Sequence, residues 1–371
     1  RSGSISVAVV RNGAIVYRFA AGASGQGTSA TPATAYHWGS MTKLVTASAV
    51  MRLVETNKIA LDAPVERYLP EFPKGLGITV RNLLDHSSGL PDPEAAQLVS
   101  FGGSTLPPLQ EVLASYLADF HGPSFPPGSD AAYSNWNYLV LGVIIERVTG
   151  IPYATYVTET ILRPLGMTHT AFRAIDLPEG ARLATPVMAT ASEAQLIDLL
   201  NTMRPRKDAE TMVLGRSGGS TYLGTFDILA PWGGLAGTAE DVARFLGMSL
   251  GSPPPGSEQV LSKATAASMR KVQRSSTGRA LPWALGWMLR PEKGEEVVEQ
   301  GGGGPGIDDL MRVYPRRHLG VVVMGNANNY GASRILSAAA EIFSAVDDAE
   351  GIPRTLESRI SGSLPRASVH P

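Results

Sequence analysis

The 371-residue sequence contains no cysteine. A thiol nucleophile, a disulfide framework, a thiolate zinc site and an iron–sulfur cluster are therefore excluded. The sequence also lacks an excess of either charge, because 32 basic residues stand against 33 acidic ones and the formal net charge is −1. A nucleic-acid binder normally carries a basic excess or a basic stripe, so we expect no nucleic-acid partner.

Long hydrophobic runs are missing as well. Apolar stretches such as Tyr138–Ile145 fall well short of the roughly 18 residues that a membrane-spanning helix needs. The chain starts at Arg1 without a charged and then apolar leader, so a signal segment is expected to be either absent or already removed. We predict a soluble protein without a membrane span, either cytoplasmic or, after signal removal, periplasmic or secreted.

The remaining composition is that of a globular protein, with 43% hydrophobic and 18% charged residues. At about 150 residues per domain, the length predicts two to three domains or one large domain with an insertion. Folding at this size buries about 75% of the surface of the unfolded chain, so a core forms without disulfides.

Strand signals concentrate at the two ends of the sequence. Residues 4–10 and 15–20 flank Asn12-Gly13, a two-residue hairpin signal. Near the C-terminus the strand signals return, followed by a helix signal; the runs are 286–289, 296–299, 310–313 and 320–324, and the helix is 335–346. Two strands from the beginning and at least three from the end predict one antiparallel sheet of five or more strands.

The predicted fold class is therefore α+β, with this sheet flanked by helices and a mostly helical domain inserted between its halves. Residues 1–50 and 280–350 are expected to form the discontinuous sheet domain, 51–279 the inserted helical domain, and 351–371 a C-terminal tail. Residues 171–231 have no long period and are interpreted as a pocket wall, a lid or a surface excursion.

Helical patterns fill the middle of the chain. Apolar residues at helical spacing follow Ser40, which caps the helix or lies in its first turn. Residues 138–148 form a helix closed by Gly150, and residues 153–162 another. Thr238, with Asp241 three positions later, begins a further helix through a capping-box variant.

The first candidate for chemistry is the pair Ser40 and Lys43. Residues three apart share a helix face, so the amine can reach the hydroxyl. A helix N-terminus favours an alkoxide on Ser40, and burial favours the neutral amine of Lys43. Such a lysine can accept the serine proton and activate a nucleophile. The alternative is an N-cap serine followed by a surface lysine.

The second candidate is Tyr133 with Asn135, in a loop before a helix. Tyr133 could relay a proton, and Asn135 could hydrogen-bond both Lys43 and a substrate carbonyl; the alternative for the tyrosine is plain packing.

The third candidate is the glycine run after Gln300, which we place between two predicted strands. Glycines there let a substrate lie against a strand edge, with a backbone N–H facing the reacting carbonyl oxygen. A dinucleotide-type phosphate loop is the alternative; it is disfavoured because Pro305 interrupts the run and no helix opens there.

These three motifs, in this order, resemble those of the penicillin-recognising serine hydrolases. That superfamily includes class C β-lactamases, DD-peptidases, D-aminopeptidases and family VIII carboxylesterases. The resemblance extends from Ser6 to about Val346 and includes further motifs, namely Leu61–Val65, Val80–Leu90, Arg163–Met167 and Gly233–Leu235.

The resemblance implies a role for each motif residue. It makes Ser40 the acylated nucleophile, Lys43 its base, Tyr133 the proton relay to the leaving group, and Asn135 the asparagine of the second motif. The oxyanion hole would use the N–H groups of Ser40 and Gly303. Gln300, Gly301 and Gly302 would line the substrate as the third motif. No cofactor and no metal is implied, and the six histidines show no metal-ligand spacing.

Gln300 departs from the family pattern, because class C β-lactamases and DD-peptidases place a lysine there and many relatives a histidine. A neutral amide neither binds a substrate carboxylate nor depresses the tyrosine pKa. We therefore expect a carboxylesterase of the family VIII type acting on small or medium acyl esters. The alternatives are a β-lactamase, a D-aminopeptidase or a DD-peptidase acting on amides, and a non-catalytic penicillin-binding-like sensor or scaffold. Oligomeric state is not predicted.

Several features resemble catalytic motifs without the right context. Ser217 lies in a G-x-S-x-G sequence, but glycines follow it where a nucleophile elbow needs a helix. His86 has Asp85 and Ser87 beside it in sequence, yet adjacent side chains do not converge, so we expect a structural histidine. Trp232-Gly233-Gly234 is interpreted as part of a turn. Three aromatic residues are suggested to line the substrate pocket, namely Trp136, Tyr222 and Trp287.

Overall fold

The computed structural model describes residues 3–25, 27–92, 99–101, 106–188, 213–217, 220–224, 226–292 and 294–345. The predicted tail at 351–371 lies outside these residues, as does 189–212 within the segment interpreted as a wall or lid.

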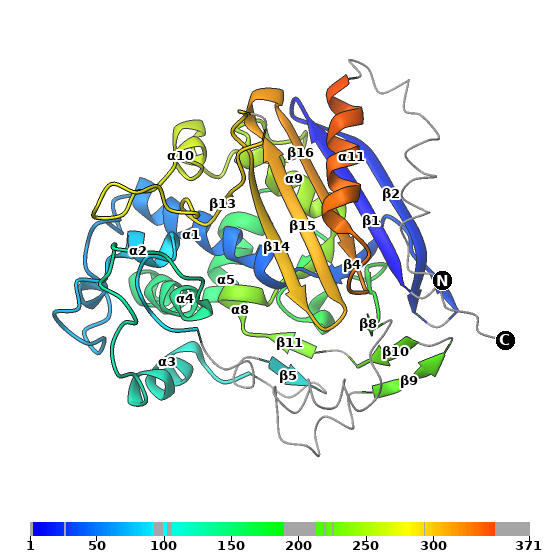
Figure 1. Cartoon of the computed structure of the whole chain (residues 1–371). Coiled ribbons are helices and arrows are strands. Elements are labelled where there is room, and N and C mark those ends of the chain that lie inside the picture. Colours follow the sequence, from blue (N-terminus) through cyan, green and yellow to red (C-terminus); the bar gives the residue numbers. More distant parts are fainter. Residues whose placement is uncertain are drawn as a thin grey trace.

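A seven-stranded antiparallel sheet is the centre of the fold (Figure 1). Its order is β13-β14-β15-β16-β1-β2-β3. The strands are β1 (Ser4–Arg11), β2 (Ala14–Gly25), β3 (Thr28–Ser29), β13 (Met288–Leu289), β14 (Val298–Gly304), β15 (Ile307–Tyr314) and β16 (Leu319–Gly325). Strand β1 pairs with β16, so the beginning and the end of the chain meet in the middle of the sheet. The predicted α+β class with an antiparallel sheet of five or more strands is confirmed.

The N-terminal hairpin forms where the sequence predicts it. Asn12 and Gly13 both have positive φ, +49° and +78°, which is the backbone of the tight turns that join twisted antiparallel strands. The residues of β1 then alternate between two cores. Val7 and Val9 belong to one core cluster with residues of helix α11 (Ala332–Ala345), while Ala8 and Val10 join the larger core on the other face.

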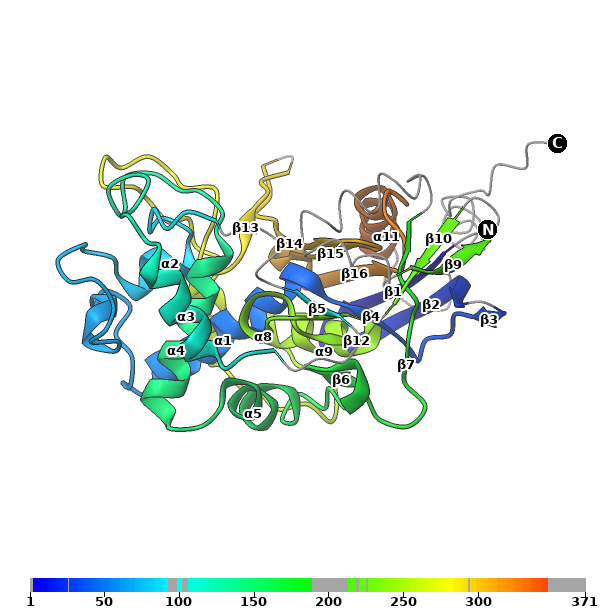
Figure 2. The ribbon, with the colours of Figure 1, turned by 90° about the horizontal axis from the view of Figure 1, so that it is seen from below.

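Two helices cover the two faces of the sheet. Figure 2 shows α11 on one side and α9 (Ala239–Ser249) on the other. Helix α9 begins as predicted, with the Thr238 hydroxyl accepting a hydrogen bond from the Asp241 backbone N–H at 3.3 Å. The central strands β1 and β16 are therefore buried, whereas β2 is partly exposed and β3 is exposed; the other helices lie beside the β13–β14 end of the sheet (Figure 1).

The remaining helices lie beside that end of the sheet (Figure 1). They are α1 (Thr42–Glu55), α2 (Val80–Leu84), α3 (Leu109–Ala118), α4 (Asn135–Thr149), α5 (Tyr153–Val157) with a π-turn at 158–162, α8 (Ala230–Gly233) and α10 (Lys263–Ser268). Helix α4 is closed by Gly150 at φ +70°, as the sequence predicts. The division at residues 50 and 280 stays a prediction.

The middle of the chain also contains short strands. One four-stranded sheet joins β6 (Thr170–Ala171), β12 (Ala236–Thr238), β4 (Thr34–His37) and β7 (Arg182–Leu183). Others join β8 (Val187–Met188), β10 (Ser220–Leu223) and β9 (Val213–Ser217), and β11 (Phe226–Ile228) with β5 (Val99–Phe101). Among the described residues, none of the helices combines the length and apolarity that crossing a bilayer requires.

Candidate active site

Ser40 lies in a 3₁₀ turn, Gly39–Met41, that leads directly into α1. Met41 occupies the cap position of α1 without a side-chain cap. The Ser40 hydroxyl is instead 3.0 Å from the Lys43 Nζ and 2.6 Å from the Tyr133 hydroxyl. The turn thus directs the Ser40 hydroxyl toward the Lys43 amine and the Tyr133 phenol, and this hydroxyl does not cap α1.

Lys43 is only 1% exposed, and its Nζ has three oxygen neighbours. These are the Ser40 Oγ at 3.0 Å, the Asn135 Oδ1 at 2.7 Å and the backbone carbonyl of Trp232 at 3.0 Å. Burial lowers the pKa of Lys43 well below its usual range, against the opposing charge of Asp92. A neutral amine has two N–H groups, enough for Asn135 and Trp232, and its lone pair then faces the Ser40 hydroxyl.

Tyr133 completes the contacts of the Ser40 hydroxyl. Burial raises the pKa of Tyr133 above its usual range, so the phenol is neutral and its O–H is available to donate. Its ring packs on the imidazole of His86, with centroids 4.7 Å apart. Of the two groups that contact the Ser40 hydroxyl, a neutral amine has a lone pair that can accept a proton, whereas a neutral phenol can only donate or relay one.

Asn135 begins helix α4 and connects the cluster to that helix. Its side-chain oxygen accepts from Lys43, and its backbone N–H donates to Asp92 Oδ1 at 2.7 Å. Helix α4 therefore positions an amide beside the lysine from one direction, while α1 brings Ser40 and Lys43 from another.

Strand β14 passes along the Ser40 turn and carries the glycine run. The prediction that these glycines lie between two strands is wrong: Gly301 to Gly304 lie within β14, paired with β15. The strand approaches so closely that a Cβ on Gly302 would lie 2.2 Å from the Trp38 carbonyl oxygen. The position of Gly39 also favours glycine, because its φ is +49° and an added Cβ would lie 3.2 Å from the Gly303 nitrogen.

Gln300 lies on the same face of β14 as Gly302, because alternate residues of a strand share a face. It is 7% exposed, and its Nε2 donates to the carbonyl of Gly301 at 3.1 Å. The face of the strand next to the Ser40 turn therefore carries a neutral amide.

Because of the close approach at Gly302, alanine substitutions at Gly302 and at Gly303 should have different effects. We expect Gly302→Ala to lose about 1–3 kcal/mol of stability, with a displaced turn and reduced activity, because the new Cβ overlaps the Trp38 carbonyl. We expect Gly303→Ala to fold and to keep its backbone N–H, because nothing lies within 4 Å of a Cβ there. Thermal unfolding and ester turnover of both variants test this pair, and equal behaviour would exclude the close approach.

Two contributors to the cluster escape sequence reasoning. Trp232 lies in a short helix, α8, and not in the turn that we predict; its backbone carbonyl accepts from Lys43. A backbone carbonyl has no residue-type signature, so no motif would reveal it. Asp92 lies two residues after the Val80–Leu90 motif, and a carboxylate at that place was a usable signal.

The residues that resemble other catalytic motifs lie in different settings. Ser217 ends strand β9 and pairs with Ser220 of β10, so a strand follows it and not the helix of a nucleophile elbow. Asp85 accepts from the Ser87 N–H and hydroxyl, while the buried His86 Nδ1 accepts from the Ser134 N–H at 3.2 Å.

The aromatic residues suggested as pocket walls are mostly interior. Trp136 and Trp287 are 2% and 1% exposed, and Trp136 stacks on Tyr116 with centroids 4.0 Å apart. The side chain of Tyr222 lies outside the described residues. Within the described part of the chain, no group of three or more histidine, aspartate or glutamate side chains is arranged to hold a metal ion.

Comparison with known proteins places these motifs in a family context. The family model described as Beta-lactamase matches residues 1–344. Penicillin-binding protein 4* of Bacillus subtilis (strain 168) is 26% identical over 294 residues, which are 78% of this chain and 60% of that protein. Esterase EstB of Burkholderia gladioli is 36% identical over 202 residues, half of each chain. The chain thus spans only part of the length of these curated relatives.

Solved structures show the same fold. The octameric penicillin-binding protein homologue from Pyrococcus abyssi superposes with a TM-score of 0.74 at 26% identity, covering 96% of this chain and 76% of the other. The residues matched by the family model include the segments that carry Ser40, Lys43, Tyr133 and β14.

Proposed function

The chain belongs to the beta-lactamase family, whose members include serine hydrolases, and on that premise we propose that it is a carboxylesterase that forms an acyl-enzyme on Ser40. The observation that carries the proposal is the contact of one hydroxyl with a buried amine and a neutral phenol, at 3.0 and 2.6 Å. Small or medium acyl esters are the proposed substrates.

The proposed reaction has two halves. The neutral amine of Lys43 takes the hydroxyl proton of Ser40 while the Ser40 Oγ bonds to the ester carbonyl carbon. The backbone N–H groups of Ser40 and Gly303 hold the oxyanion, and the proton passes through Tyr133 to the leaving alcohol as the C–O bond breaks. Water then attacks the acyl carbon while Lys43 takes its proton, the bond between that carbon and the Ser40 Oγ breaks, and the proton passes through Tyr133 to Oγ as the acid is released.

The neutral side chain of Gln300 favours ester substrates over substrates that carry a carboxylate. A substrate such as a β-lactam or a peptide ending in a free carboxylate presents an anion, and a cation on the third strand would bind it. Gln300 offers an amide in that place and is held by Gly301. The stretch shared with Esterase EstB also supports an esterase, whereas the match to penicillin-binding protein 4* supports the amide-hydrolysing alternatives.

A substrate panel tests the proposal against its alternatives. We expect turnover of p-nitrophenyl acetate and butyrate to exceed that of nitrocefin and D-amino-acid amides in kcat/KM. Faster turnover of nitrocefin or of D-amino-acid amides would make the chain a β-lactamase or a D-aminopeptidase instead. A persistent acyl adduct on Ser40 by intact mass, without turnover of any substrate, would make it a sensor.

The acid side of the pH profile tests the role of Lys43. Since burial lowers its pKa in the folded protein, the neutral amine is favoured, and protonation on acidification removes the base. We expect log kcat/KM for a neutral ester to be flat near neutral pH and to fall with a slope of about 1 as pH drops through the lowered pKa. A profile that rises up to the usual lysine pKa near 10 would contradict a neutral buried amine.

A further inference from the structure

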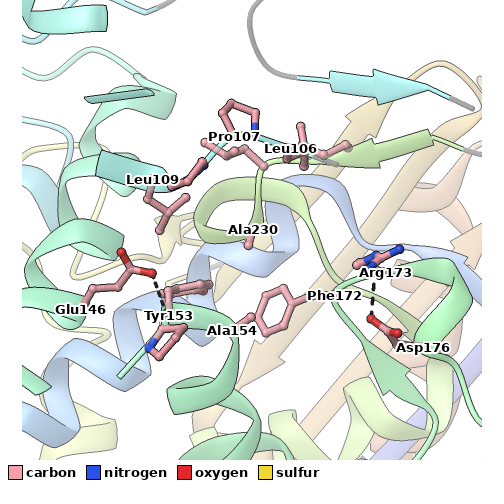
Figure 3. Close-up of a pocket in the computed structure, with 14 residues that line it drawn as sticks. Leu106, Pro107, Leu109, Glu146, Tyr153, Ala154, Phe172, Arg173, Asp176 and Ala230 are labelled. Atoms are coloured by element: carbon pink, nitrogen blue, oxygen red, sulfur yellow. Dashed lines mark hydrogen bonds and ion pairs between the residues drawn. The ribbon is translucent and has the colours of Figure 1, made fainter. Parts of the chain in front are cut away.

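A cavity of about 360 Å³ lies between the start of α3, the end of α4, α5 and α8 (Figure 3). Its walls are largely apolar and include Leu109, Tyr153, Phe172 and Leu229. Its volume is within the range of small-molecule sites and holds an aromatic ring with a short side chain. No residue proposed for catalysis lines it, so it is a different space from the one at Ser40.

The charged groups of this cavity favour a cation. Three charged side chains line it, and two of them, Arg173 and Asp176, pair with each other at 4.0 Å. The third, Glu146 at the end of α4, accepts a hydrogen bond from the Tyr153 backbone N–H at 2.9 Å through one oxygen. Its negative charge has no cationic partner among the lining residues, so an ammonium group beside apolar walls suits the cavity.

Helix α8 connects the cavity to the catalytic lysine. Ala230 lines the cavity, and the next two residues of the helix offer their carbonyls to α1. The Pro231 carbonyl accepts from the Thr46 hydroxyl at 2.6 Å, and the Trp232 carbonyl accepts from Lys43 at 3.0 Å. The Thr46 hydroxyl also contacts the hydroxyl of Tyr153, a cavity residue, at 2.7 Å. A ligand that moves α8 therefore moves an acceptor of the Lys43 amine.

We propose that this cavity is a second small-molecule site, taking a compact apolar cation such as an arylalkylamine, and that its occupation alters acylation of Ser40 through α8. The apolar body packs against Leu109, Phe172 and Leu229, and the ammonium group pairs with Glu146. Ligand and substrate affinities are then coupled, because α8 contacts both sites.

Direct binding tests the site. The full chain is titrated calorimetrically with 2-phenylethylamine and with its neutral counterpart 2-phenylethanol. We expect the amine to bind about tenfold more tightly, a difference of about 1.4 kcal/mol. Ala154→Phe fills the cavity from α5 and should abolish binding of both ligands (Figure 3). Glu146→Gln keeps an acceptor for the Tyr153 N–H and should remove only the preference for the amine.

Controls separate the possible outcomes. Glu159→Gln removes an exposed carboxylate that pairs with Arg163 outside the cavity, and it should leave binding unchanged. Absence of saturable binding, or binding that persists in Ala154→Phe, would overturn the site, and equal affinity for amine and alcohol would overturn the cationic ligand class. Thermal unfolding of the two cavity variants shows whether each is folded. Because binding is measured without turnover, this result is independent of the reaction at Ser40.

Kinetics test the coupling separately. At saturating 2-phenylethylamine we expect kcat/KM of the wild-type protein for a p-nitrophenyl ester to change by at least about fivefold, the lower end of the usual range of coupling free energies. The same concentration should leave Ala154→Phe unaffected. An unchanged rate in the wild-type protein with the amine bound would overturn the connection through α8.

Discussion

Replacing Ser40 with alanine is expected to lower ester turnover by about 10⁴-fold or more and to abolish the acyl adduct in intact-mass spectra. The Oγ is the atom that contacts both Lys43 and Tyr133, so its removal leaves no nucleophile in the cluster. The backbone turn at Gly39–Met41 does not use this hydroxyl as a helix cap, and the variant should fold. Initial rates, intact mass and thermal unfolding of the Ser40→Ala variant measure the three effects.

Ser217→Ala is the matched control for the nucleophile. Ser217 also lies in a motif that hydrolases use, but it ends strand β9 and a further strand follows it. We expect this variant to retain most of its activity. The opposite result, with activity lost in Ser217→Ala and kept in Ser40→Ala, would overturn the mechanism.

Replacing Lys43 with methionine is expected to lower kcat/KM by about 10³-fold and to remove the acid limb of the pH profile. Methionine is unbranched and fills the buried space of the lysine stem without a titrating group. The loss has two sources: the base is gone, and the Asn135 Oδ1 and the Trp232 carbonyl lose their donor. Steady-state rates between about pH 5 and pH 10 measure the change.

Two further measurements make the Lys43→Met result specific. Lys58→Ala changes an exposed lysine just beyond the end of α1 and should leave the rate unchanged. Thermal unfolding of Lys43→Met separates a catalytic loss from a folding defect. If Lys43→Met is folded and keeps more than a tenth of the activity, another group is the base.

Sequence reasoning succeeded where the signal is local. The Asn12-Gly13 hairpin, the Thr238 cap and the Gly150 helix end each rest on the φ preference or hydrogen-bonding capacity of one or two residues. The spacing of Ser40 and Lys43 is also local, because one helical turn brings them together. The glycine run was misplaced because glycine usually marks loops, whereas here the neighbouring turn requires glycine within the strand.

The sequence by itself determined the candidate residues for catalysis, the absence of thiol chemistry, and the strands at both ends of the chain. Only the tertiary structure decided that Tyr133 and Asn135 meet Ser40 and Lys43, that the Trp232 carbonyl accepts from the amine, and that a cavity lies along α8. The physical reason is that a pKa depends on burial, and a backbone carbonyl is the same chemical group in every residue. The Lys43 amine and the Trp232 carbonyl are brought together by packing between segments that are far apart in the chain.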